Sequence, residues 1–247
     1  MGPPIRLWAP AAACFCCAAT VGADVIDRLP PIDLVMELAG CPIDIDAWTC
    51  GDLVPLADGT FRFTGEHRVE GVGEVRWSLR YHPDPFVVAN LVVTNNTDSA
   101  QDYSITVNLP TTMPGPTLIG GFIVGQFCDG LGDGAILSVP PTGAIYEAQV
   151  DGLAVAGGGL LEGPLTILGG PYECIAVGPA EFGSPVPSAP SGPVALSIGL
   201  SVQFTLSARD TATFMSQFVV EPAAAAAGGG DGPTSAPINA SNRKEMP

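Results

Sequence analysis

The amino-acid sequence predicts an all-β protein: an antiparallel β-sandwich of immunoglobulin-like or jelly-roll-like type, followed by a disordered C-terminal tail. Three observations lead to this fold class. Several segments alternate apolar and polar residues with period two, which is the pattern of a strand with one buried face. Turn-forming residues separate these segments, with 31 glycines and 25 prolines in 247 residues. Helical periodicity is almost absent, so face-to-face antiparallel sheets are the expected architecture.

The balance of charge limits the partners of the chain. It has 25 acidic and 9 basic residues, for a formal net charge of -16. A nucleic-acid-binding surface needs clustered Lys and Arg to neutralise phosphates, and Lys244 is the only lysine. We therefore expect no nucleic-acid partner.

Residues 1–23 are typical of a secretory signal peptide. Arg6 precedes an apolar stretch over residues 7–20, and small residues at Val21 and Ala23 predict cleavage after Ala23, with Ala19 as a second candidate. The competing interpretation is a buried N-terminal helix or a membrane anchor, but the stretch is shorter than a membrane span and Pro10 interrupts it. No later segment has 18 uninterrupted apolar residues. We expect a secreted chain, extracellular or periplasmic, with no membrane span after cleavage.

Four cysteines remain after the predicted cleavage: Cys41, Cys50, Cys128 and Cys174. An even number of cysteines in an exported chain indicates disulfides. Three pairings are possible. The short segment between Cys41 and Cys50 favours a local bond, which leaves Cys128 to pair with Cys174. Zinc binding is disfavoured because no CxxC pair is present.

The region before the sandwich has the weakest pattern. Residues 24–60 are expected to be an irregular segment packed on the sandwich. Within it, residues 32–40 fit either a helical turn or a strand.

Residues 61–221 are expected to form the β-sandwich. The clearest alternation places Val75, Trp77, Leu79 and Tyr81 on one face of a strand. Expected strands cover 74–81, 86–94, 103–109, 118–127, 135–139, 145–150, 160–168, 200–206 and 211–220. A Pro/Ser/Gly-rich loop is expected over 178–193, and the last two strands are expected to pair as a hairpin about the turn at residues 208–210. Residues 222–247 are of low complexity and predict the disordered tail.

Two segments carry a family resemblance. Residues 87–110, VVANLVVTNNTDSAQDYSITVNLP, and residues 198–222, IGLSVQFTLSARDTATFMSQFVVEP, resemble exported, uncharacterised bacterial β-sandwich (Ig-like) proteins. Some members of that group carry PEP-type C-terminal sorting tails. This chain has only Val220-Glu221-Pro222 and lacks the membrane helix and basic end of such a tail. Because the group has no known activity, the resemblance implies fold and location alone.

One loop has residues of the kind that bind calcium. Asp129 and Asp133 lie in the segment CDGLGDG, where carboxylates and carbonyls could hold a weakly bound ion. Leu131 and Pro140 occupy positions where an EF-hand needs acidic ligands. An Asp/Gly-rich turn is the preferred interpretation, so we expect no cofactor, with calcium as the alternative.

Other candidate sites are isolated. Trp48, between Cys41 and Cys50, is the one plausible residue for stacking on a sugar. Acidic groups at Asp44/Asp46 and Asp24/Asp27/Asp33 would suit a hydrolase only if two carboxyls lay close together. No nucleophile elbow or catalytic triad is recognisable. We therefore expect a secreted non-catalytic structural or interaction module. The alternatives are a carbohydrate- or cell-surface-binding module and, less favoured, a hydrolase with an acid pair.

Overall fold

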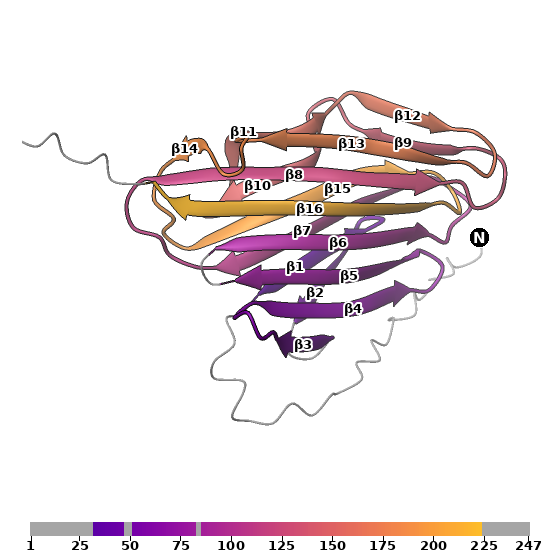
Figure 1. The fold of residues 1–247 in the computed structure, drawn as a ribbon. Helices are drawn as coiled ribbons and strands as arrows, with labels where there is room; N and C mark the ends of the chain where they lie inside the picture. Colours follow the sequence, from indigo (N-terminus) through magenta and orange to yellow (C-terminus); the bar gives the residue numbers. More distant parts are fainter. Residues whose placement is uncertain (1–31, 47–50, 83–84, 224–247) are drawn as a thin grey trace, which may run out of the picture.

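The computed structural model describes residues 32–46, 51–82 and 85–223, which form sixteen strands in two antiparallel sheets packed against each other (Figure 1). This confirms the predicted all-β sandwich. The predicted signal peptide at 1–23 and nearly all of the predicted tail at 222–247 lie outside the described residues. No helix in the described part of the chain is long and apolar enough to cross a membrane.

The first sheet, sheet A, has eight strands. Its main order is β11 (Leu153–Glu162), β10 (Ala144–Val150), β15 (Ser197–Leu206), β7 (Gln101–Pro110), β1 (Asp33–Leu38) and β2 (Cys41–Asp46). A two-stranded extension joins the far end of β15, where β9 (Ala135–Val139) pairs with β15 and β12 (Leu165–Gly169) pairs with β9.

The second sheet, sheet B, also has eight strands. Its order is β13 (Cys174–Phe182), β8 (Thr117–Cys128), β16 (Thr211–Pro222), β6 (Phe86–Asn95), β5 (Gly73–His82), β4 (Phe61–Val69) and β3 (Asp52–Pro55). The short strand β14 (Ala189–Ser191) pairs with the start of β8.

The core lies between the two sheets, as the alternating patterns predict. Trp77 is 4% exposed and Leu79 is fully buried. Aromatic rings bridge the layers: Phe204 of sheet A lies 5.7 Å from Tyr103 of the same sheet and 5.0 Å from Phe214 of sheet B, between ring centroids. Burial of these side chains from water is the main force that holds the sheets together.

The expectation of an irregular segment at 24–60 is wrong for most of its described part. β1 and β2 form a hairpin of sheet A, and β1 lies between β2 and β7. Leu34, Met36 and Leu38 point into the core and are fully buried. The alternation over these residues is that of a strand, and pairing with β7 excludes the helical alternative. β3 in turn extends sheet B beside β4.

The predicted hairpin of the last two strands is also wrong. Both strands exist, but β15 pairs with β7 and β10 in sheet A, whereas β16 pairs with β6 and β8 in sheet B. The turn between them therefore crosses from one sheet to the other. Each strand has one apolar face, and the two faces pack against each other across the core instead of lying side by side in one sheet.

Two further boundaries differ from the prediction. The single strand expected at 160–168 is divided between β11 and β12, which are separated at Gly163-Pro164, since proline interrupts a strand. The loop expected at 178–193 contains the second half of β13 and all of β14. The first half of β13 was missed because only Val177 of its side chains is buried, so that it shows no clear apolar face.

Candidate functional site

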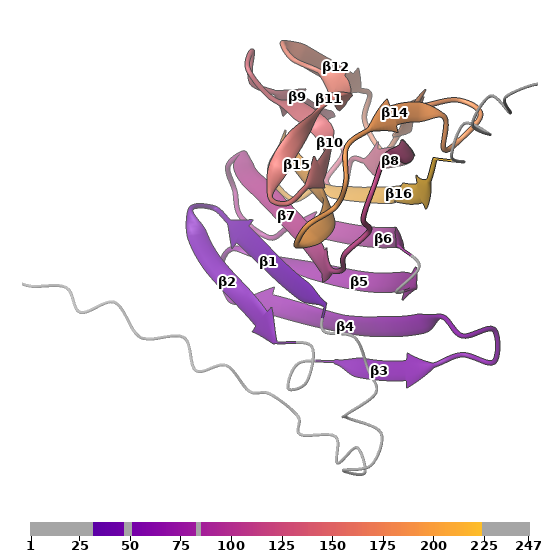
Figure 2. The ribbon, with the colours of Figure 1, turned by 90° about the vertical axis from the view of Figure 1, so that its left-hand side faces the viewer.

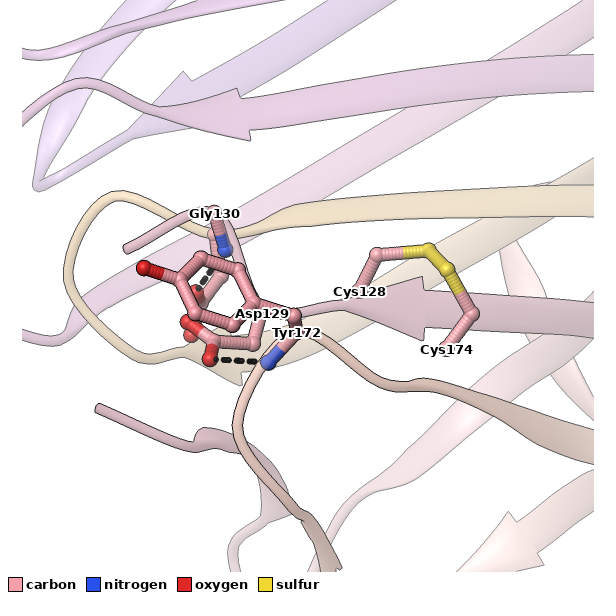
Figure 3. Close-up of a disulfide and its surroundings, with 6 residues drawn as sticks. Cys128, Asp129, Gly130, Tyr172 and Cys174 are labelled. Carbon is pink, nitrogen blue, oxygen red and sulfur yellow. Dashed lines mark hydrogen bonds between the residues drawn. A yellow bond between two sulfur atoms is a disulfide. The ribbon is translucent and has the colours of Figure 1, made fainter. Parts of the chain in front are cut away.

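The predicted calcium loop lies at the end of the sandwich that we call the loop end, formed by residues 95–100, 129–134, 170–173 and 207–210. The carboxylate of Asp129 accepts hydrogen bonds from the backbone N–H groups of Leu131, Gly132, Gly134 and Tyr172, at 2.8–3.1 Å (Figure 3 shows the bond to Tyr172). Burial alone would raise the pKa of Asp129, but these four donors outweigh it and lower the pKa to about 2. Asp129 thus organises the loop as a turn.

Gly132 completes this turn. Its φ of +85° lies in the left-handed region, and a Cβ atom there would lie 2.2 Å from the ring of Tyr172. Only glycine satisfies both the backbone conformation and the close approach of the ring.

Two further acids lie near Asp129. Asp133 is exposed, whereas Asp210 is fully buried and accepts hydrogen bonds from the Ser207 hydroxyl and the Gly130 N–H. Burial raises the pKa of Asp210, and the neighbouring charges of Asp129 and Asp133 raise it further. Within the described residues, no group of three or more His, Cys, Asp or Glu side chains is placed to hold a metal ion. Calcium binding by Asp129 and Asp133 therefore stays a sequence-based prediction.

The disulfide between Cys128 and Cys174 is present, with an S–S distance of 2.02 Å (Figure 3). It links directly opposed residues of β8 and β13 beside the Asp129 loop. Cys41 is exposed at the start of β2 and forms no disulfide with another described cysteine. Its predicted partner Cys50 lies outside the described residues, so that pairing stays a prediction.

The structure does not bring the other predicted site residues together. Trp48, the predicted stacking residue, lies outside the described residues, as do Asp24 and Asp27. Asp44 is exposed on β2 at the edge of sheet A, and the register of β1 and β2 places Asp33 opposite Asp46. None of the acids Asp33, Asp44 and Asp46 lines the groove described next.

A polar groove of about 620 Å³ lies elsewhere, on the outer face of sheet A. Figure 2 shows the strands that border it, with β9 and β12 above, β1 and β2 below, and β7 and β15 between them. The residues that line the groove are Glu37, Asp102, Tyr103, Ser104, Ser138, Val139, Pro140, Thr166, Gln203, Phe204 and Thr205. Its volume is within the range of ordinary ligand sites.

Strand alternation explains the polarity of the groove. Tyr103 and Phe204 direct their rings into the core, so the residues on either side of them direct their side chains outward. On β15 these are Gln203 and Thr205, and Thr205 lies opposite Ser138 of β9. The described floor therefore presents mainly side chains with hydroxyl, amide and carboxylate groups, because the Tyr103 and Phe204 rings that also line the groove are almost completely buried.

Most of the polar groups in the groove have no partner within the described part of the protein. The hydroxyl of Thr205 donates a hydrogen bond of 2.5 Å to Asp102 Oδ1. The side chains of five other lining residues make no hydrogen bond or ion pair with a described residue: Glu37, Ser104, Ser138, Thr166 and Gln203. Among the described residues, two carboxylates line the groove, and no Lys, Arg or His does so.

The sequence analysis missed this groove. Each of its polar residues is an outward residue of an alternating strand, and such residues ordinarily face only water. They converge because β7 and β15 are neighbours, and because β9 and β12 extend the sheet beside them.

No family model matches the chain, and no curated protein is detectably similar to it.

Proposed function

We propose that this protein is a secreted, non-catalytic binding module that holds a neutral or amine-bearing carbohydrate chain in the groove of sheet A. The observation that carries the proposal is the set of hydroxyl, amide and carboxylate groups in one open groove that have no partner among the described residues. Sugars offer many hydroxyl groups that both donate and accept hydrogen bonds, and these complement such a surface. The disulfide supports export, because such bonds persist mainly in oxidising compartments.

Charge defines the kind of glycan. With Glu37 and Asp102 in the groove and no basic residue among its described lining, an anionic sugar would meet two like charges. A neutral sugar avoids this repulsion, and an amino sugar adds attraction. Because the aromatic rings that line the groove are almost completely buried, we expect recognition by hydrogen bonds instead of ring stacking.

A glycan array tests this function. Wild-type protein is expected to bind neutral or amino-sugar glycans and not glycans rich in uronic acids. Replacing Gln203→Ala removes one hydrogen-bonding side chain, which should weaken binding roughly two- to tenfold. Gln217→Ala is the matched control, since Gln217 lies on β16 in the other sheet. The proposal fails if no such glycan binds, or if the control weakens binding as much as the groove variant.

A hydrolase is the second candidate, because Glu37 and Asp102 are diagonal neighbours across the β1–β7 pair, where Glu37 lies opposite Ser104. Diagonal neighbours lie about 7–8 Å apart, which is within the range of carboxyl separations that an inverting glycosidase uses. A catalytic acid must, however, be kept protonated by a buried environment, and both carboxylates are exposed. Turnover of glycosides that is lost in both Glu37→Gln and Asp102→Asn would favour the hydrolase.

A further inference from the structure

One edge strand of the sandwich has no charged residue, proline or bulge to protect it from pairing with other chains. An edge strand presents unpaired backbone N–H and C=O groups, and proteins usually shield them with charge, proline, bulges or shortness. Among the described strands, β12 pairs only with β9, and it forms the upper right margin of the described structure in Figure 1. Its sequence, Leu165-Thr166-Ile167-Leu168-Gly169, contains no charged residue and no proline.

The other edge strands in the described structure are all protected. β2 and β3 contain both aspartate and proline, β13 contains proline, glutamate and a register shift, and β14 is three residues long with a central proline. β11 ends in a glutamate and is irregular in its pairing with β10. The unprotected edge of β12 is therefore an exception within this molecule.

Apolar side chains surround this exposed edge. Leu168 is 68% exposed and lies opposite Ile136 of β9, which is 45% exposed. Both point to the same outer face as Thr166 and Ser138, which line the groove. Exposed apolar groups next to an open strand edge are typical of an interaction surface.

We propose that β12 is the pairing edge for a second copy of this chain, which joins antiparallel to it about a two-fold axis. Centred on Ile167, this pairing places Thr166 opposite Leu168 of the second copy and Leu165 opposite Gly169. Every β12 side chain that lies opposite a residue of the second copy is then uncharged. This matters because the chain has a formal net charge of -16 and repels its own copies elsewhere.

Self-pairing also agrees with the position of the groove. Thr166 lies in its wall, so two copies joined through β12 would place their two grooves on one continuous sheet face. The pairing strand has only five residues, so we expect a weak, concentration-dependent dimer.

Sedimentation velocity of the full secreted chain, without ligand and over a wide range of concentrations, tests the proposal. The wild type should pass from monomer to dimer as concentration rises. Leu168→Glu places a charge on the edge and should raise the dissociation constant at least about tenfold. Leu153→Glu is the matched control: it changes an equally exposed leucine, 73% exposed, on edge strand β11, and should leave the dimer unchanged.

Hydrogen–deuterium exchange provides a second measurement that does not depend on a variant. The amides of residues 165–169 should exchange more slowly as concentration rises, because half of them gain new hydrogen bonds. Wild type that remains monomeric at every concentration would overturn the proposal, as would a dimer that survives Leu168→Glu or is lost in Leu153→Glu. Because no ligand is present, these outcomes are separate from the fate of the proposed glycan binding.

Discussion

The loop end and the groove use polar side chains in opposite ways. At the loop end, polar groups bond to the protein itself. Asp129 accepts four backbone N–H groups, and the Asn95 amide donates to the carbonyls of Ser99, Leu206 and Ser207. In the groove, five polar side chains have no described partner. Polar groups satisfied internally fix the fold, whereas those left open are available to a ligand.

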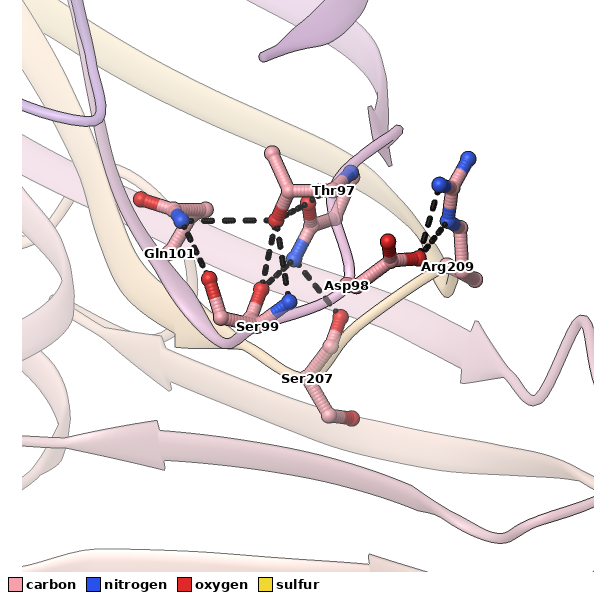
Figure 4. Close-up of polar contacts among 7 residues, drawn as sticks. Thr97, Asp98, Ser99, Gln101, Ser207 and Arg209 are labelled. Carbon is pink, nitrogen blue, oxygen red and sulfur yellow. Dashed lines mark hydrogen bonds and ion pairs between the residues drawn. The ribbon is translucent and has the colours of Figure 1, made fainter. Parts of the chain in front are cut away.

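Further contacts at the loop end show the same internal use. Arg209 binds Asp98, so the turn between β15 and β16 is tied to the loop between β6 and β7 (Figure 4). The Gln101 amide donates to the hydroxyls of Thr97 and Ser99 (Figure 4). The β6–β7 loop and the β15–β16 turn both cross from one sheet to the other, so their hydrogen bonds hold the two layers in place at this end.

The largest expected effect tests the structural role of the loop end. Replacing both Cys128→Ser and Cys174→Ser opens a loop with a sequence separation of 46 residues, which should cost about 4 kcal/mol of unfolding free energy. Chemical denaturation with and without reductant measures this loss. Binding of the glycan by the folded variant should be unchanged. A parallel loss of binding would show that the two regions are not independent.

The next largest expected loss of stability concerns Asn95, which is fully buried. Its side chain accepts hydrogen bonds from the N–H and hydroxyl of Thr97 and donates to three backbone carbonyls. Asn95→Ala leaves several buried groups unpaired and should destabilise the protein by about 3 kcal/mol. Asn96→Ala is the matched control, because within the described residues Asn96 makes a hydrogen bond only through its backbone N–H. Equal destabilisation by both variants, measured by urea denaturation, would contradict the assigned role.

A smaller effect depends on pH. The pKa of Asp210 is raised by burial in the folded protein. Between the unfolded and folded pKa values, the carboxyl is therefore protonated in the folded state but ionised in the unfolded state. The contribution of neutral Asp210 to the free energy of unfolding is therefore fully present below the unfolded pKa, and it is lost as pH rises through the folded pKa. Asp210→Asn mimics the neutral form, so its stability relative to wild type should increase as pH rises above the unfolded value.

Thermal unfolding of wild type and Asp210→Asn across an acidic to neutral pH series measures this difference. Asp133→Asn is the control, since it makes the same substitution at an exposed position near Asp210. An Asp210→Asn variant that loses stability relative to wild type as pH rises would show that the buried carboxylate is stabilising.

The smallest expected effect on stability lies in the groove. Ser104→Ala removes a half-buried hydroxyl that has no partner in the described structure, so the free energy of unfolding should change by no more than about 0.5 kcal/mol. Glycan affinity should nevertheless fall. Calorimetric unfolding and glycan titration of the same sample separate the two effects. A marked loss of stability with intact binding would show that Ser104 has a structural role, and would contradict the assignment of the groove to ligand binding.

The sequence predicted the Cys128–Cys174 bond but none of the groove. The disulfide could be predicted because cysteines are few and their pairing options are countable. The groove could not, because Ser104 and Gln203 are ordinary outward residues until their strands are placed side by side. The two wrong descriptions, of residues 24–60 and of the β15–β16 hairpin, have the same origin: both concern which strand lies beside which.

By itself, the sequence determined which side chains face the core, where most strands break, and that the described chain folds without helices. These properties depend on the period-two direction of side chains and on local turn chemistry, which neighbouring residues decide. Tertiary structure alone decided the division of strands between two sheets, and with it the groove and the open edge of β12. Strand pairing uses backbone hydrogen bonds that are the same for every residue, so the choice among partners depends on packing across the whole core.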